Sequence, residues 1–151
     1  MRRTAATTAV TMTAAAALLT GLSGCGQGKS TGPHKSAAEE KLSLIKSGTE
    51  WNMAHQQFMA GDLDKALRSV DQSIALNPRV PKSHVLRGRI LIEKGRLEDA
   101  RASLLEAEKL DPTNAEPQYY LGIIHERFNQ PVEALERYRE ASACEAGNPL
   151  F

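Results

Sequence analysis

Residues 95–112 read GRLEDARASLLEAEKLDP and carry the signals of one helix with a marked start and stop. Small and apolar side chains recur at spacings of three and four, which places them on one helical face: Leu97, Ala100, Leu104, Ala107 and Leu110. Gly95 precedes the helix, and the Asp-Pro pair at 111–112 ends it, because the residue before a proline disfavours helical backbone.

The same pattern recurs thirty-four residues away on both sides. Toward the N-terminus it is GDLDKALRSVDQSIALNP (61–78), and toward the C-terminus it is NQPVEALERYREASACEA (129–146). Glycine, leucine, alanine and proline repeat in matching columns between the first two copies: Gly61/Gly95, Leu63/Leu97, Ala66/Ala100, Leu76/Leu110 and Pro78/Pro112. A fixed period of this length is typical of stacked repeats, in which neighbouring units bury one another.

A second helical segment precedes each copy, over residues 48–60, 82–94 and 116–128. Each unit is therefore expected to be two helices joined by a turn. A small residue recurs in the first helices, at Ala54, Gly88 and Gly122. Small residues let two helices approach closely, so we expect Gly88 to face Ala100 across the central hairpin. Larger side chains, among them Leu104 and Tyr138, are expected to fill the gaps.

The period, the small-residue columns and the two terminal prolines resemble the tetratricopeptide repeat family. The resemblance implies an all-α fold, an α-solenoid of about three helix-turn-helix units over residues 47–148: 47–80, 81–114 and 115–148. Some positions depart from the pattern: Ser73 replaces alanine, Trp51 lies one place after the usual tryptophan column, and Ala146 takes the last proline column. Asn129 replaces the turn glycine, where asparagine tolerates left-handed backbone. Residues 36–46 predict an extra helix, which either merges into the first unit or covers its end.

The N-terminus has the layout of a secretory signal over residues 1–24. Arg2 and Arg3 precede an Ala/Thr/Leu-rich run and small residues. The stretch Leu22–Cys25 resembles the bacterial lipobox, which implies acylation of Cys25 and a lipid anchor. The alternative is an ordinary signal peptide cut nearby. Residues 25–35 are polar and rich in Gly, Ser and Pro, which predicts a flexible tether. The expected location is the bacterial cell envelope, and Gly26 favours the outer membrane facing the periplasm if the cell is Gram-negative.

Charge and motif content argue against several functions. The formal net charge is +1, so no strong basic field predicts nucleic-acid binding. His34, His55, His84 and His125 do not have metal-ligand spacing, and no nucleophile motif is present. His125 and Cys144 fall in columns that hold leucine in other units, which predicts structural roles. We therefore expect no enzyme activity, no cofactor and no metal.

The family resemblance implies a groove, lined by the first helices, that binds a protein or peptide partner. Carried over by column, the groove residues are Trp51, His55, Phe58, Met59, Val85, Arg89, Ile92, Tyr119, Ile123, Glu126 and Arg127. The alternative for some of them, Trp51 above all, is packing beneath the extra helix. The implied function is a membrane-anchored, non-catalytic adaptor or assembly scaffold. The second hypothesis is a self-association module that forms homo-oligomers through the groove or the C-terminal face.

Two further features bear on the partner. Some family members clamp the C-terminal carboxylate of heat-shock chaperones with lysines, asparagines and an arginine. The matching positions are Trp51, His55, Leu86, Glu116 and Tyr120, none of which is a lysine, an arginine or an asparagine. A mixed aromatic and aliphatic groove favours an apolar segment or an amphipathic helix. The last helix would also leave Leu135, Tyr138 and Cys144 partly uncovered, with residues 149–151 or another protein over them.

Overall fold

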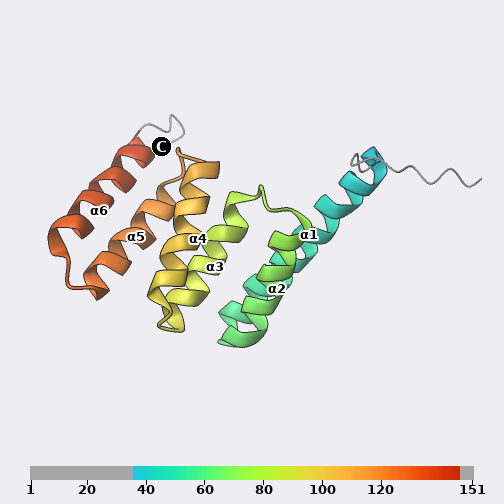
Figure 1. Cartoon of the computed structure of the whole chain (residues 1–151), viewed down its shortest axis with the longest axis horizontal. Helices are drawn as coiled ribbons and strands as arrows, with labels where there is room; N and C mark the ends of the chain where they lie inside the picture. The colour runs from blue at the N-terminus through green and yellow to red at the C-terminus, as the bar shows by residue number, and fades with distance from the viewer. Residues whose placement is uncertain (1–35, 147–151) are drawn as a thin grey trace, which may run out of the picture. The chain divides into compact units, whose positions relative to one another are not determined.

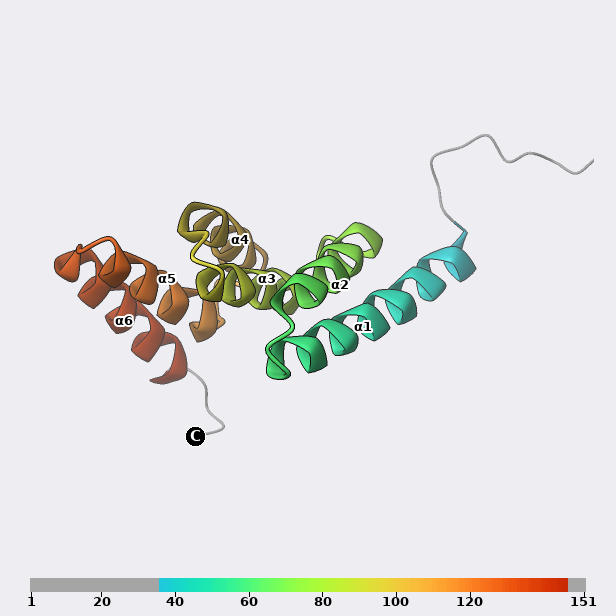
Figure 2. The ribbon, with the colours of Figure 1, turned by 90° about the horizontal axis from the view of Figure 1, so that it is seen from below.

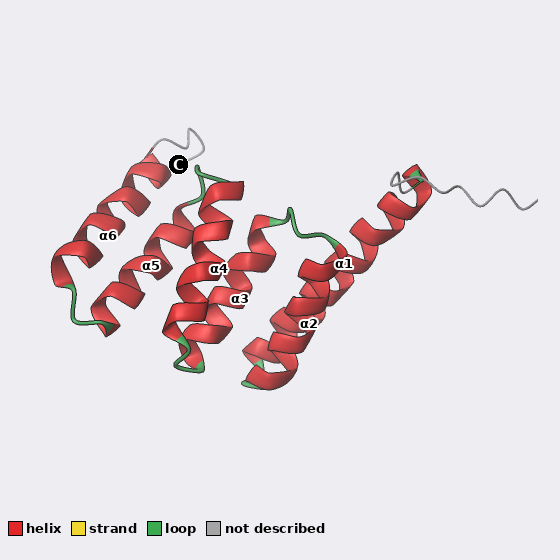
Figure 3. Ribbon diagram, in the orientation of Figure 1, coloured by secondary structure: helices red, strands yellow, loops and turns green. Residues whose placement is uncertain are grey.

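The structure is a computed structural model that describes residues 36–146. Within that range the chain forms six α-helices and no strand (Figure 3). The helices are α1 (Ala37–Met59), α2 (Leu63–Leu76), α3 (Pro81–Glu93), α4 (Leu97–Leu110), α5 (Ala115–Arg127) and α6 (Pro131–Ala146). They pair as three hairpins, and the α3–α4 hairpin lies between the other two (Figure 1). The predicted all-α fold of helix-turn-helix units is confirmed.

Several predictions from the sequence fall outside residues 36–146. They are the signal peptide at 1–24, the lipidated Cys25 with its linker at 25–35, and the tail at 149–151. These remain predictions. Among the described helices, none combines the length and the apolar composition that crossing a bilayer requires.

The turns inside the three hairpins share one backbone conformation. Gly61 and Gly95 have positive φ angles of 80° and 72°, and Asn129 has a φ of 58°. The prediction that asparagine replaces the turn glycine by adopting left-handed backbone is confirmed. Pro131 then begins α6, where its missing N–H costs no hydrogen bond.

The predicted extra helix at 36–46 is not a separate element. It continues without a break into the first helix of the first unit, which gives α1 its 23 residues. Ser36 begins it with a capping box to Glu39, and Gly48 in its interior costs only about 1 kcal/mol relative to alanine. The first turns of α1 extend beyond α2 (Figure 2), and they leave Leu42, Leu44 and Ile45 at least half exposed.

Two core clusters join the hairpins into one stack. The first contains Ala54 from α1, Ala66 and Val70 from α2, and Leu86 and Ile90 from α3. The second joins the middle and last hairpins through these buried residues: Leu91, Ile92, Ala100, Leu104, Leu121 and Ile124. Because α3 contributes to both clusters, each hairpin is buried partly by its neighbour, as stacked repeats require.

The contact inside the central hairpin differs from the prediction by one helical turn. A Cβ atom added to Gly88 would lie 2.7 Å from Cγ of Leu104, so Gly88 faces Leu104 and not Ala100. Ala100 is fully buried nearer the turn, in the same cluster as Leu91. In an antiparallel hairpin, position 102 mirrors Gly88 across the turn at Gly95, and Ala100 and Leu104 lie equally far from it. Chain spacing alone therefore does not decide which of the two faces Gly88, and the packing of the helices selects Leu104.

At this contact, a larger residue on the second helix of a hairpin faces a smaller residue on the first helix. The first unit has Ala54 and Val70 in the two columns, both fully buried. The second unit has Gly88 with Leu104. The third has Gly122, whose added Cβ would collide with the ring of Tyr138. The larger the side chain on the second helix, the smaller the residue on the first, which keeps the filled volume similar in all three hairpins.

Ser73, which replaces alanine in the first unit, belongs to a buried serine cluster. Its Oγ donates to the carbonyl of Ser47 at 3.0 Å and lies 3.1 Å from Oγ of Ser83. All three residues are at most 3% exposed. The cluster links α1, α2 and α3 through satisfied hydroxyl groups, so the polar substitution carries no burial penalty.

Candidate partner-binding groove

Trp51 lies on α1 and is held by the start of α3. Its ring stacks on His55 with centroids 5.2 Å apart, and Nζ of Lys82 lies 4.4 Å from its centroid. The indole Nε1 donates to the carbonyl of Lys82 at 3.2 Å. Because residues 36–46 continue α1 itself, they do not cover Trp51. Half-buried Trp51 and His55 keep part of their surface open.

A line of aromatic side chains and one arginine runs across α1, α3 and α5, the first helices of the three units, and ends on α6. We call it the aromatic ladder: Phe58, Arg89, Tyr120, Tyr119 and Tyr138. The Arg89 guanidinium lies between Phe58 of α1 and Tyr120 of α5, at 5.1 Å and 5.3 Å from the ring centroids. Tyr119 follows edge-on to Tyr120, and then contacts Tyr138 of α6 at 5.7 Å. Cation–π and aromatic contacts therefore connect all three units on one side.

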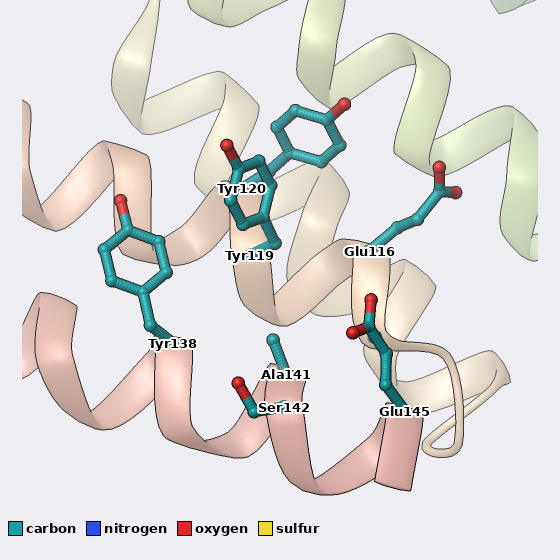
Figure 4. Close-up of a pocket in the computed structure, with 8 residues that line it drawn as sticks. Glu116, Tyr119, Tyr120, Tyr138, Ala141, Ser142 and Glu145 are labelled. Carbon is teal, nitrogen blue, oxygen red and sulfur yellow. The ribbon is translucent and has the colours of Figure 1, made fainter. Parts of the chain in front are cut away.

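The ladder ends in a hollow between α5 and α6, which we call the tyrosine hollow (Figure 4). Its volume is about 590 Å³. The side chains that shape it are Glu116, Tyr119 and Tyr120 from α5, and Tyr138, Ser142 and Glu145 from α6. The two carboxylates gather at one end and Tyr138 lies at the other. Tyr119 is 50% exposed, so the rings offer apolar faces to solvent.

Two tyrosines of the hollow, Tyr138 and Tyr120, resist ionisation. Burial raises the pKa of Tyr138 to about 12, and a hydrogen bond and the negative charge of Glu126 act in the same direction. Burial also raises the pKa of Tyr120, although the positive charge of Arg89 opposes the change. Both phenols are therefore neutral at physiological pH and act as hydrogen-bonding groups with apolar faces.

The raised pKa of Tyr138 predicts a loss of stability in alkali. The folded state holds the phenol proton up to a pKa of about 12, whereas the unfolded chain releases it near 10. The stabilisation is complete below pH 10 and is lost as the pH rises from 10 through 12. Urea unfolding at about pH 9 and about pH 11 measures it, and Tyr138→Phe should lose less stability over this interval. An equally steep loss in Tyr138→Phe would contradict the assignment.

Two predicted groove residues are buried instead. Val85 and Ile92 are only 2% and 3% exposed, and Ile92 belongs to the second core cluster. This corrects the prediction that they line an open groove. The reason is that α3 lies between α1 and α5, so a side chain that would line a groove on a terminal hairpin is covered on the central one.

The remaining predicted residues take different positions. Met59 is 70% exposed at the end of α1. Ile123 packs against the second core cluster while half-buried. Exposed Arg127 donates from Nη1 to the carbonyl of Ile92 at 3.1 Å, which caps the last turn of α3. The carboxylate of Glu126 contributes to the raised pKa of Tyr138. The structure thus brings together Trp51 with His55, and Phe58 with Arg89. Tyr119 is linked to Arg89 only through the ring of Tyr120.

The sequence argument missed the tyrosine hollow. It predicted Tyr119 as a groove residue and Tyr138 as a hairpin filler that stays partly uncovered. It counted Glu116 and Tyr120 only as mismatches to a carboxylate clamp, and so did not bring the four side chains together. The available signal was the thirty-four-residue period. Columns that face the next unit have no next unit within residues 36–146, so Tyr119 and Tyr138 remain open.

Other residues with reactive side chains have structural contacts. His125 is half-buried, and its Nδ1 lies 2.8 Å from the Gln130 side-chain oxygen in the last turn. Cys144 is half-buried, with Sγ 3.8 Å from the carbonyl of Pro112, which agrees with the expectation that it is partly uncovered. Over residues 36–146, no three His, Cys, Asp or Glu side chains gather as metal ligands would.

Comparison with known sequences identifies the repeat type. Residues 88–127 match the sequence profile "TPR repeat", and residues 48–72 match "Tetratricopeptide repeat". The chain is 31% identical over 75 residues to human protein O-mannosyl-transferase TMTC3, a match that covers 50% of this chain and 8% of that protein. The chain spans about a tenth or less of the curated relatives that it matches.

Solved structures support the same repeat. The translocator chaperone SycD of Yersinia enterocolitica superposes with a TM-score of 0.68 at 16% identity, over 74% of this chain and 84% of that one. The second TPR of Spaghetti (RPAP3), bound to the HSP90 peptide SRMEEVD, gives 0.67 at 14% identity, over 71% and 98%. Profiles and structures together support tetratricopeptide repeats in this chain, and that fold points to protein–protein interaction.

Proposed function

We propose that this chain of tetratricopeptide repeats is a non-catalytic adaptor that holds a protein partner along the aromatic ladder. The observation that carries the proposal is the placement of Arg89. Its guanidinium joins Phe58 of α1 to Tyr120 of α5, so one continuous surface crosses all three units. Aromatic residues and arginine are the side chains most enriched where proteins bind one another.

The neighbouring structures support this use of the fold. One of them holds a peptide, SRMEEVD, and another is a chaperone for a secretion translocator. The peptide carries three acidic side chains. The hollow of this chain carries Glu116 and Glu145, which would repel such a ligand. We infer a partner of different charge that binds through a comparable fold.

Site-specific photo-crosslinking tests the adaptor function. A photoreactive residue at exposed Tyr119 should form an adduct with a partner in detergent-solubilised membranes, whereas the same residue at exposed Arg101 on α4 should not. Arg89→Glu should reduce the Tyr119 adduct about tenfold, because it breaks the contacts that order the ladder. Equal adducts from both positions, or none from Tyr119, would overturn the proposal.

Membrane anchoring is a further part of the proposal, and the N-terminal sequence supports it. The lipobox-like Leu22–Cys25 follows an apolar run, and a polar Gly/Ser-rich segment separates Cys25 from α1. Acyl chains on Cys25 would tether the repeats to a bilayer, each buried methylene contributing about 0.8 kcal/mol. We propose the bacterial cell envelope as the location, at the outer membrane facing the periplasm if the cell is Gram-negative.

Self-association is the second candidate function. Apolar side chains are exposed at both ends of the stack: Leu42, Leu44 and Ile45 on α1, and Val132 and Leu135 on α6. An end-to-end contact between copies would cover both sets. Sedimentation of the chain without residues 1–25 separates the two functions, since a mass independent of concentration supports the adaptor and a rising mass supports self-association.

A further inference from the structure

The tyrosine hollow occupies the position that a helix fills one unit earlier. Tyr119 and Tyr138 fall thirty-four residues after Val85 and Leu104. Val85 is 2% exposed and Leu104 is fully buried, and Leu121 and Ile124 of α5 pack in the same cluster as Leu104. In the last unit the corresponding positions face the open hollow. The chain therefore contains its own example of how this surface is covered.

We propose that the tyrosine hollow binds an amphipathic helix of the partner protein through a lysine or arginine on that helix. The proposal rests on the adaptor function and specifies its ligand. A helix is the expected shape because α5 is the element that covers the equivalent surface in the preceding unit. A polar contact accompanies that packing, since Gln118 of α5 donates to Glu108 at 2.9 Å, and Ser142 is the residue in the Glu108 column.

The negative charge of the hollow is the reason to expect a lysine or arginine on the partner helix. Glu116 and Glu145 line the same end of the hollow, and neither has an ion pair with another residue of the range 36–146. The neighbouring rings offer faces that attract a cation. The chain already uses that contact twice, with Lys82 over Trp51 and with Arg89 between two rings.

The column comparison supports the same charge. The residues one unit earlier than Glu116 and Glu145 are Lys82 and Asp111, which balance one another in formal charge. In the last unit both positions are acidic. The hollow therefore carries more negative formal charge than the equivalent surface of the central unit, and this difference favours a cationic ligand.

The test uses two labelled amphipathic peptides of about 18 residues, long enough to form a helix. They share one leucine seam, and lysines flank it in one peptide and glutamates in the other. With the chain lacking residues 1–25, fluorescence anisotropy should give a Kd at least about tenfold lower for the lysine peptide. The double variant Glu116→Gln/Glu145→Gln should reduce the preference to about twofold. The matched control Glu93→Gln/Glu136→Gln, at exposed positions away from the hollow, should preserve it.

Two other variants separate this inference from the adaptor function. Glu145→Lys should shift the binding preference toward the glutamate peptide. Tyr138→Ala should weaken binding of the lysine peptide, provided that circular dichroism shows the variant chain to be as helical as the parent. Lysine-peptide binding that survives all hollow variants but fails in Arg89→Glu would overturn the inference and leave the adaptor intact. Failure of both peptides to bind would also overturn it. A change of sedimentation mass in Tyr138→Glu would assign the hollow to a second copy instead.

Discussion

Replacing Gly88 by alanine is expected to lower the melting temperature of the repeat stack by roughly 5 °C or more. The new Cβ would lie 2.7 Å from Cγ and 2.8 Å from Cδ2 of Leu104, in a fully packed hairpin. Overpacking of this kind costs about 1–3 kcal/mol, which outweighs the gain of up to about 1 kcal/mol in helix propensity. Because neighbouring units share their stability, the whole transition should shift.

The chain offers both a control and a rescue for this change. Gly48→Ala places a Cβ with no atom within 4 Å, inside a helix, so it should leave stability unchanged or raise it. Leu104→Val combined with Gly88→Ala reproduces the Ala54–Val70 pair of the first unit and should recover most of the loss. Calorimetry of these variants measures the coupling. If Gly88→Ala is as stable as Gly48→Ala, the hairpin is not packed as described.

Replacing Cys25 by serine is expected to abolish membrane association. The thiol is the proposed point of lipid attachment, and a serine hydroxyl would not be acylated there. In detergent phase partitioning, the Cys25→Ser chain should appear in the aqueous phase and not in the detergent phase. The mature lipid-modified band should disappear. Cys144→Ser is the matched control, since Cys144 lies on α6 and should leave partitioning unchanged. A Cys25→Ser chain that is cut normally and stays in the detergent phase would refute lipidation.

The sequence predicted the helices well because the period is a local and repeated signal. Gly95, Pro112 and the column of small residues each fix a boundary or a face without reference to the rest of the chain. The left-handed turn at Asn129 followed for the same reason, since only glycine and a few polar residues tolerate that conformation. Signals of this kind depend on backbone chemistry and survive without knowledge of tertiary contacts.

The details that the sequence missed depend on three-dimensional packing. The pairing of Gly88 with Leu104 is one of them, because Ala100 and Leu104 are equally placed by chain spacing and only the packed helices distinguish them. Ile92 was placed in a groove because its column faces one in the family, but the central hairpin has neighbours on both sides. The sequence left two alternatives for residues 36–46, because no residue at Lys46 or Ser47 distinguishes one helix from two, and the structure shows the merged one.

The reciprocal sizes across the hairpins have a consequence for how such a gene can be rearranged. Exchanging or duplicating a segment that begins and ends between units keeps each small residue with its own large partner, as Gly122 stays with Tyr138. A crossover at the turn inside a hairpin would instead join Ala54 to Leu104, or Gly122 to Val70, and leave a clash or a void. Viable recombinants should therefore have their junctions near residues 77–80 or 111–114, where one unit ends and the next begins.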